Sequence, residues 1–191
     1  SRLHAPDGVY SILGNHDYLT YAYYLSPEEQ AAQREELKER QRDMNWDLLL
    51  NEHRIIRQGR DSIALVGVEN DGKPPFPERG DLKKALAGIP GYGQGNDSTH
   101  MFKVLLSHDP THWRRKVLPQ TDIQLTLSGH THGMQFMLFG WSPSKFFYPE
   151  WKYMYREDER GLYVSLGIGG ALIPFRFGAW PEINVITLHN K

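Results

Sequence analysis

The sequence predicts a layered α/β (α+β) fold whose strand ends bring potential metal ligands together. Strand-like and helix-like segments alternate between residues 102 and 127. Three separate apolar strands end in a small residue followed by a polar side chain, at Asn15 with His16, at His108 and at His130. The 191 residues, 39% hydrophobic and 24% charged, predict one globular domain over residues 1–191 with a sizeable core.

The first part of the chain predicts a buried strand followed by a surface helix. Residues 8–13 are apolar and partly β-branched, and a loop follows them. Ser26 is a capping residue, Pro27 occupies the first helical position and Glu29 completes a capping box, so a helix should begin there. This helix should continue to about Arg42 and, being mostly charged, should dock by one edge only.

A hairpin is predicted next, from residues 54–57 and 62–68 around the turn 58–61, with its second strand buried on both faces. The other predicted elements follow in chain order. They are a loop at 73–77, a short helix at 81–87, a flexible connection at 91–97, a strand at 102–106, a helix at 110–118, and strands at 123–127, 162–166 and 183–188.

Composition excludes several classes of function. The 23 acidic residues nearly cancel the 22 basic ones, so no nucleic-acid partner is expected from bulk charge. No apolar run approaches the roughly 20 residues that span a bilayer, and the first ten residues lack the pattern of a signal peptide. Without cysteine there is no disulfide or thiolate site, so any metal must be bound by His, Asn, Asp or Glu.

The strand-end residues predict one shared metal site. Loops at the carboxyl ends of neighbouring strands converge on a rigid support, and small preceding residues allow close backbone approach. His130 and His132 are two positions apart and would face the same way in extended chain. A single strand-end histidine is more often a hydrogen-bonded structural residue, but an ordered set favours a site. Imidazole with amide or carboxylate oxygen suits Mn, Zn, Fe or Ni, which the residues do not distinguish.

These residues resemble a known family. Gly14-Asn15-His16-Asp17, Ser107-His108-Asp109-Pro110 and the segment 129–135 resemble the last three motif blocks of the calcineurin-like metallophosphoesterases, in order. The resemblance runs from residue 8 to about residue 188. The Gly-His-Thr-His-Gly-x-Gln segment, with the late segments 172–177 and 181–183, is similar to the bacterial branch of small or membrane-associated phosphodiesterases.

The resemblance implies a fold, a reaction and a role for each residue. The fold would be two packed β-sheets flanked by helices, an αββα sandwich, with two divalent metal ions at one edge. A metal-activated water would hydrolyse a phosphodiester or a phosphomonoester. Asn15, His108 and His130 would bind one metal and His132 the other, while His16 would stabilise or protonate the substrate and Asp17 would orient its ring. Asp109 would cap the following helix.

Two motif blocks of the family are absent from the sequence. An Asp-x-His and a Gly-Asp-x-x-Asp should precede Gly14, and the imitation at Gly80-Asp81 is better explained by helix capping. We therefore interpret the chain as the C-terminal portion of such an enzyme, truncated or proteolysed, lacking its first strands and binding metal weakly. The missing strands would expose a sheet edge and favour a homodimer, for which an exchange of strands between the two copies is one route. The alternative is a non-catalytic, metal-poor fragment that serves as a binding or assembly module.

Two aromatic clusters flank the proposed site. One hypothesis makes them a mini-core beneath long loops. The other makes them an apolar rim that receives a lipid-like phosphoester or rests on a membrane, so the location would be cytoplasmic or peripheral at the bacterial cell membrane. Arg176 would bind a substrate phosphate bidentately or make a structural ion pair. The cluster residues are Tyr18, Tyr21, Tyr23 and Tyr24, and Phe139, Trp141, Phe146, Phe147, Tyr148, Trp151, Tyr153 and Tyr155.

Overall fold

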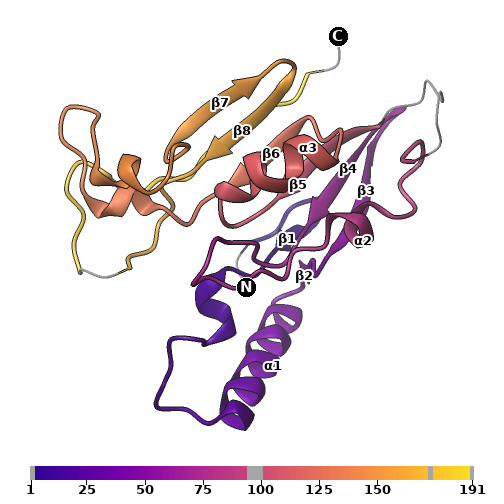
Figure 1. Cartoon of the computed structure of the whole chain (residues 1–191). Coiled ribbons are helices and arrows are strands. Elements are labelled where there is room, and N and C mark those ends of the chain that lie inside the picture. The colour runs from indigo at the N-terminus through magenta and orange to yellow at the C-terminus, as the bar shows by residue number, and fades with distance from the viewer. Residues whose placement is uncertain (1–2, 94–100, 172–173, 190–191) are drawn as a thin grey trace.

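The chain forms two β-sheets with flanking helices, as the sequence predicts (Figure 1). The computed structural model describes residues 3–93, 101–171 and 174–189. Helices α2 (Leu82–Leu86) and α3 (Leu118–Gln120) lie on one face of the larger sheet, and the smaller sheet lies on the other. None of the described helices is long and apolar enough to cross a membrane.

The larger sheet has six strands in the order β3-β4-β5-β6-β8-β7. Its four central strands are parallel, and each outer strand pairs with its neighbour in antiparallel fashion. Parallel central strands direct their carboxyl ends to one edge, which positions the loops that follow β5 and β6 side by side. The strands are β3 (Glu52–Gln58), β4 (Asp61–Gly67), β5 (Phe102–Leu106), β6 (Leu125–Ser128), β7 (Tyr153–Glu157) and β8 (Arg160–Val164).

The smaller sheet pairs β1 (Val9–Ser11) with β2 (Trp46–Leu48) in parallel. Helix α1 (Pro27–Asp43) connects them and contacts β2. Fully buried Leu49, just after β2, packs with Tyr10 and Ile12 against the larger sheet. This packing holds the carboxyl end of β1 beside those of β5 and β6.

A hydrophobic core lies on each face of the larger sheet. On the α2 and α3 face, fully buried residues such as Val66, Leu105 and Trp113 form the main core. On the other face, Leu65, Val104 and Leu125 pack beneath the smaller sheet. Burial on both faces explains the apolar runs at residues 63–66 of β4 and 104–106 of β5.

Local capping signals in the sequence are confirmed. Ser26 Oγ accepts a hydrogen bond from Glu29 N (3.2 Å), and Glu29 Oε2 accepts one from Ser26 N (2.7 Å), so α1 begins with the predicted capping box. Asp81 Oδ1 accepts a hydrogen bond from Lys84 N (2.9 Å), so Asp81 is the N-cap of α2. The predicted hairpin is β3–β4, with Gly59 in a left-handed conformation at its turn.

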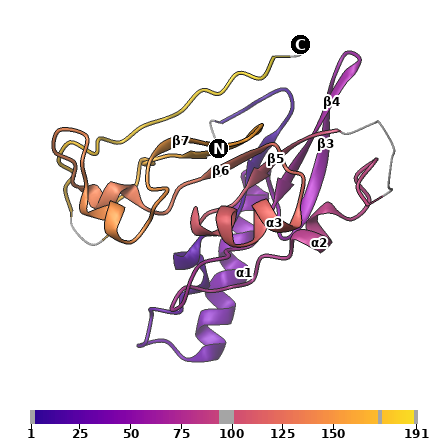
Figure 2. The ribbon, with the colours of Figure 1, turned by 45° about the horizontal axis from the view of Figure 1, so that its top comes forward.

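Several elements differ from the predictions. The predicted strand at 183–188 is wrong: the segment runs past the sheet without joining it (Figure 2), and Ile183 and Val185 are exposed. An alternating apolar pattern becomes a strand only where a neighbour provides hydrogen bonds. The short strand β2 and the edge strand β7 were not predicted. The helix predicted at 110–118 contains the π-helical turn η2 (Trp113–Val117), and the predicted connection at 91–97 lies partly outside the described residues.

A buried polar network fixes this helix beside the end of β5. The His112 Nδ1 atom lies 2.8 Å from Ser107 Oγ, and the fully buried Asp71 carboxylate forms ion pairs with Arg115 (2.6 Å) and Lys116 (2.7 Å). These contacts join the helix, the loop after β4 and the residue that precedes His108. The network therefore supports the backbone from which His108 projects.

Stability should fall in mild acid because of His112. Burial lowers the pKa of His112 to about 4, whereas an unfolded histidine has a pKa of about 6.5. The free energy of unfolding is therefore unaffected above pH 6.5 and falls by about 1.4 kcal/mol per pH unit toward pH 4, because the unfolded chain then binds the extra proton. We expect the free energy of unfolding, measured by urea titration at a series of pH values from 7.5 to 4, to fall less steeply with falling pH in His112→Gln than in the wild type. The difference in slope should correspond to the uptake of about one proton on unfolding. Equal slopes in both proteins would exclude this role.

Candidate metal centre

Three side chains from both sheets meet at the carboxyl ends of their strands. Asn15 lies in the short helix η1 (Asn15–Tyr18) after β1, His108 follows β5, and His130 follows β6. Asn15 Oδ1 lies 3.0 Å from His108 Nε2 and 3.0 Å from His130 Nδ1, and these two nitrogens are 3.2 Å apart. Three lone-pair atoms therefore form a nearly equilateral triangle.

The triangle has the dimensions of one face of a metal coordination sphere. Ligand atoms about 2.1 Å from a divalent ion, at angles of 90–109°, lie about 3.0–3.4 Å apart. The three observed separations, 3.0 to 3.2 Å, fall in this range. Asn15, His108 and His130 thus fit the group that the motifs predict, with no change in their side-chain positions.

The triangle contains two imidazoles and one amide. Within residues 3–93, 101–171 and 174–189, no group of three or more His, Cys, Asp or Glu side chains is arranged to hold a metal ion. Here the third donor atom is the Asn15 amide oxygen, which is a neutral and weaker ligand than a carboxylate. The described residues thus offer a partial coordination sphere.

Burial keeps both imidazoles neutral. Desolvation, reinforced by neighbouring histidines, lowers the pKa of His108 to about 3 and the pKa of His130 to about 4. Both rings therefore have a free lone pair at neutral pH, the form in which histidine binds metals. Asp109 lies close, with Oδ2 3.8 Å from His130 Nε2, but its Oδ1 caps the following helix by accepting from Thr111 N (2.8 Å), as predicted.

His132 lines the same cavity as the triangle but is held differently. The cavity, about 690 Å³, is bordered by Asn15, His16, His108, His130 and His132 among others. The prediction that His130 and His132 lie in extended chain is wrong, because both have positive φ, at 67° and 48°. The His132 Nδ1 atom lies 3.2 Å from Leu166 O and 2.9 Å from Arg176 Nη2, away from the three donor atoms.

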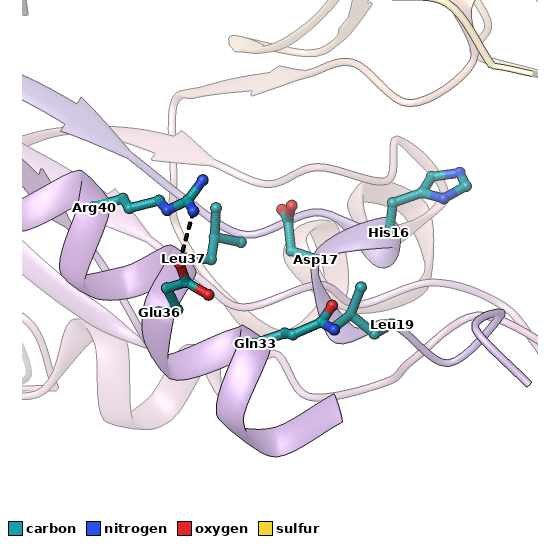
Figure 3. A pocket seen from close by; sticks show the side chains of 7 residues that line it. All are labelled: His16, Asp17, Leu19, Gln33, Glu36, Leu37 and Arg40. Atoms are coloured by element: carbon teal, nitrogen blue, oxygen red, sulfur yellow. Dashed lines mark hydrogen bonds and ion pairs between the residues drawn. The ribbon is translucent and has the colours of Figure 1, made fainter. Parts of the chain in front are cut away.

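His16 is exposed in the cavity, and Asp17 positions it by a hydrogen bond to the backbone. Asp17 Oδ2 accepts a hydrogen bond from Gly14 N (2.7 Å), so the carboxylate closes the turn that presents His16. Figure 3 shows the His16 ring and the Asp17 carboxylate pointing in different directions. Both residues also border a second cavity of about 360 Å³ along α1, where Gln33 and Arg40 provide polar groups.

Arg176 is bound by backbone carbonyls. Its guanidinium donates to Leu166 O (2.8 Å), Ala179 O (3.0 Å) and Gly169 O (2.9 Å from Nε), besides touching His132. The described contacts of Arg176 contain no carboxylate, so the structural ion pair considered above is not formed there. Arg176 instead ties the loop after β8 to the His132 ring.

Two aromatic residues contribute to the site in ways the sequence analysis did not predict. Tyr148 Oη lies 2.7 Å from His130 Nε2, so it holds the ring edge opposite to the one in the triangle. Phe76 packs edge-on against His130 with ring centroids 4.9 Å apart. The many aromatic residues after the His-x-His segment were the sequence signal that could have predicted a role for Tyr148 in the site. No comparable signal distinguishes Phe76 from the other residues of its loop.

Glycine is required before one ligand and not before another. A Cβ atom on Gly14 would lie 2.8 Å from two atoms of the His108 ring, closer than real contacts allow. At Gly129 the nearest atom would be Ser165 O at 3.9 Å, an ordinary contact. The predicted close approach is therefore confirmed at Gly14, where the backbone of η1 packs directly on a site histidine. At Gly129 the backbone also comes close, with Gly129 N donating to His108 O (3.0 Å), but a side chain would fit there.

Comparison with known proteins supports the motif resemblance. The chain is 30% identical over 198 aligned residues to an uncharacterized metallophosphoesterase, YkuE, of Bacillus subtilis, covering 98% of this chain and 58% of that protein. It is 32% and 29% identical to proteins named transmembrane protein with metallophosphoesterase domain from Danio rerio and Bos taurus, covering 95% of this chain and 38% of each. The chain thus spans less than two thirds of the length of these relatives. No family model and no solved structure matches it.

Replacing Gly14 with alanine should destabilise the chain through His108. The backbone of Gly14 (φ −99°, ψ 178°) suits any residue, so the cost comes from the contact between the new Cβ and the ring. We expect Gly14→Ala to lower the free energy of unfolding by about 1–3 kcal/mol in urea titrations. In a His108→Ala background the same change should cost much less. An identical cost in both backgrounds would contradict the close packing.

Proposed function

Because this chain belongs to the calcineurin-like metallophosphoesterase superfamily, we propose that it forms the ligand-bearing part of a metal-dependent phosphoesterase. The proposed reaction is hydrolysis of a phosphodiester or phosphomonoester at a dinuclear site. The observation that supports it best is the triangle of Asn15, His108 and His130 donor atoms, 3.0 to 3.2 Å apart. The chain spans only part of its relatives, so the activity belongs to the proposal for the whole protein.

The ligand roles follow from position in the cavity. Asn15, His108 and His130 would hold one divalent ion and His132 a second, the metal being Mn, Zn, Fe or Ni. The chemistry that such ions would supply, when bound, is a water of lowered pKa as the nucleophile and neutralisation of charge on the phosphate oxygens. Tyr148 supports this arrangement because its hydroxyl oxygen can accept a hydrogen bond from the N–H at His130 Nε2. In that tautomer Nδ1 has a free lone pair and can be the ligand atom.

His16 is proposed as the residue that acts on the leaving group. Its ring is exposed in the cavity, and it packs at 5.2 Å against the Tyr21 ring, whose hydroxyl lies 3.3 Å from Asn15 Nδ2. A substrate phosphate near the triangle would therefore be within reach of the imidazole, which can stabilise charge or donate a proton. Asp17 would keep His16 in place by closing the turn from Gly14.

The binding role of Arg176 and the assembly state extend this proposal. The contact of Arg176 with His132 supports a positioning role, and a direct contact with substrate phosphate stays a prediction. The homodimer and the cytoplasmic or peripheral location also stay predictions. The names of the relatives do not favour the alternative of a non-catalytic binding or assembly module.

The chain should bind one divalent ion through the triangle. In isothermal titration with Zn²⁺ or Mn²⁺ at pH 7.5, we expect His108→Ala and His130→Ala each to weaken binding by about tenfold or more, since each removes one of three donor atoms. His4→Ala is the matched control, because His4 is exposed and lies outside the cavity lining. Equal binding by all four proteins would place the ion elsewhere.

Hydrolysis by the intact protein should separate the two histidine roles. With Mn²⁺ and bis(p-nitrophenyl) phosphate or the monoester, His16→Ala should lower kcat by about 10²- to 10⁴-fold at every metal concentration. His132→Ala should lose activity at low Mn²⁺ and regain part of it as Mn²⁺ is raised, since it would be a ligand. Unchanged rates in both variants would refute the role assignments.

A further inference from the structure

Aromatic side chains form an exposed surface next to the candidate site. Residues 134–152 and 174–182, here called the aromatic lobe, project beyond the sheet from the ends of β6 and β7 (Figures 1 and 2). The two segments are joined by Phe177 N donating to Gln135 O (2.8 Å) and Met137 N donating to Phe177 O (2.7 Å). The exposed rings, with their exposed fractions, are Phe139 101%, Phe146 77%, Phe147 65%, Trp180 63%, Phe175 60% and Trp141 46%.

The aromatic lobe has an inverted polarity. Its buried side chains include Gln135, Ser142 and Ser144, each at most 2% exposed, whereas most of its rings face outward. Ser142 Oγ donates to Gly133 O (2.7 Å), and Gln135 Nε2 donates to Phe175 O (2.7 Å). Polar contacts thus hold the aromatic lobe together while its apolar side chains contribute little to its stability. The mini-core hypothesis is confirmed at Trp151 and Tyr18, which are 6% and 2% exposed, and at Tyr155, which packs against the main core. It is wrong for the exposed rings of the aromatic lobe.

Large exposed apolar side chains gathered on one lobe mark a site of contact with another apolar phase. Phenylalanine and tryptophan on loops, with lysine among them, are the residues that proteins place at a membrane interface. A water-facing surface would gain nothing from six exposed rings. The composition of the aromatic lobe therefore matches a lipid surface.

The charges of the aromatic lobe indicate the kind of lipid. Lys145 is exposed among the rings, whereas Lys152 is half-buried and its Nζ donates to Gly140 O (2.9 Å). The carboxylate of Glu150 is buried and paired with Arg114 (2.5 Å), and Glu182 accepts a hydrogen bond from Leu166 N (2.8 Å). The accessible charge of the aromatic lobe is therefore positive, which complements anionic headgroups.

The aromatic lobe is connected directly to the site. Tyr148, which follows Phe146 and Phe147, contacts His130 Nε2 at 2.7 Å. Gly170 and Ala171, next to the second segment of the aromatic lobe, border the cavity together with His132. A molecule held at the aromatic rings would thus lie beside the entrance to the cavity.

We infer that the aromatic lobe docks on the surface of an anionic phospholipid bilayer and receives a lipid phosphoester from it. The rings enter the boundary between headgroups and acyl chains, and Lys145 contacts lipid phosphates. The substrate part of this inference rests on the proposed function, whereas the docking does not.

Vesicle co-sedimentation of the chain, with EDTA present, tests the docking. We expect binding to vesicles of phosphatidylglycerol and phosphatidylcholine, weaker binding to phosphatidylcholine alone, and weakening by salt. Phe146→Ser with Phe147→Ser should reduce binding by about tenfold or more. Tyr23→Ser with Tyr24→Ser is the matched control, because these rings are 87% and 86% exposed and lie outside the aromatic lobe. Circular dichroism should show that all three proteins keep the same fold.

Three outcomes would overturn the docking: no binding by the wild-type chain, equal binding by the Phe146 and Phe147 variant, or an equal loss in the tyrosine control. Light scattering that shows a dimer, abolished by the same phenylalanine changes and without vesicle binding, would assign the surface to a second copy instead. Failure of the proposed function looks different. If the intact wild-type protein with Mn²⁺ hydrolyses neither bis(p-nitrophenyl) phosphate nor the monoester, while the chain still binds vesicles, the docking stands and the substrate part of the inference falls.

Discussion

The carboxamide of Asn15 joins the two sheets of this protein. It comes from the smaller sheet, is 1% exposed, and approaches two imidazoles that belong to the larger sheet at 3.0 Å each. The amide oxygen can accept a hydrogen bond from each ring, but two ring nitrogens that both carry hydrogen would then face each other 3.2 Å apart without an acceptor. Whichever neutral tautomers the rings adopt, at least one of the three contacts therefore lacks a hydrogen bond. A cation bound to the three atoms would remove this conflict, in agreement with the proposed metal site.

The rest of the structure keeps that approach short. Leu49 presses the smaller sheet onto the larger one, Gly14 leaves room for the His108 ring, and His112 with Ser107 fixes the end of β5. Each of these residues positions the three donor atoms, and none of them is proposed to contact the metal or the substrate. Loss of any of them should change the separations within the triangle, on which the proposed metal site depends.

The aromatic lobe is the reverse of an ordinary loop region, and its polarity suits its place beside the cavity. Its inner hydrogen bonds allow it to stay ordered in water without burying its rings. Its rings are therefore available to a partner, and Tyr148 makes the same loop part of the site. Recognition of a surface and positioning of His130 are thus combined in one segment.

The sequence by itself determined the elements whose signals are local. The capping box of α1, the cap at Asp81, the β3–β4 hairpin and β5 were all predicted at nearly their observed bounds, because each depends on neighbours in the chain. The gathering of Asn15, His108 and His130 was also predictable, since strand ends in a layered fold converge.

Only the tertiary structure decided the features that depend on partners distant in sequence. Residues 183–188 have a strand pattern, yet no described strand pairs with them. The backbone of His130 and His132 turns through positive φ, so His132 meets Arg176 instead of the triangle. Tyr148 and Phe76 reach His130 from two loops whose order no local signal fixes. These contacts depend on packing between residues far apart in the chain, so the local sequence pattern does not predict them.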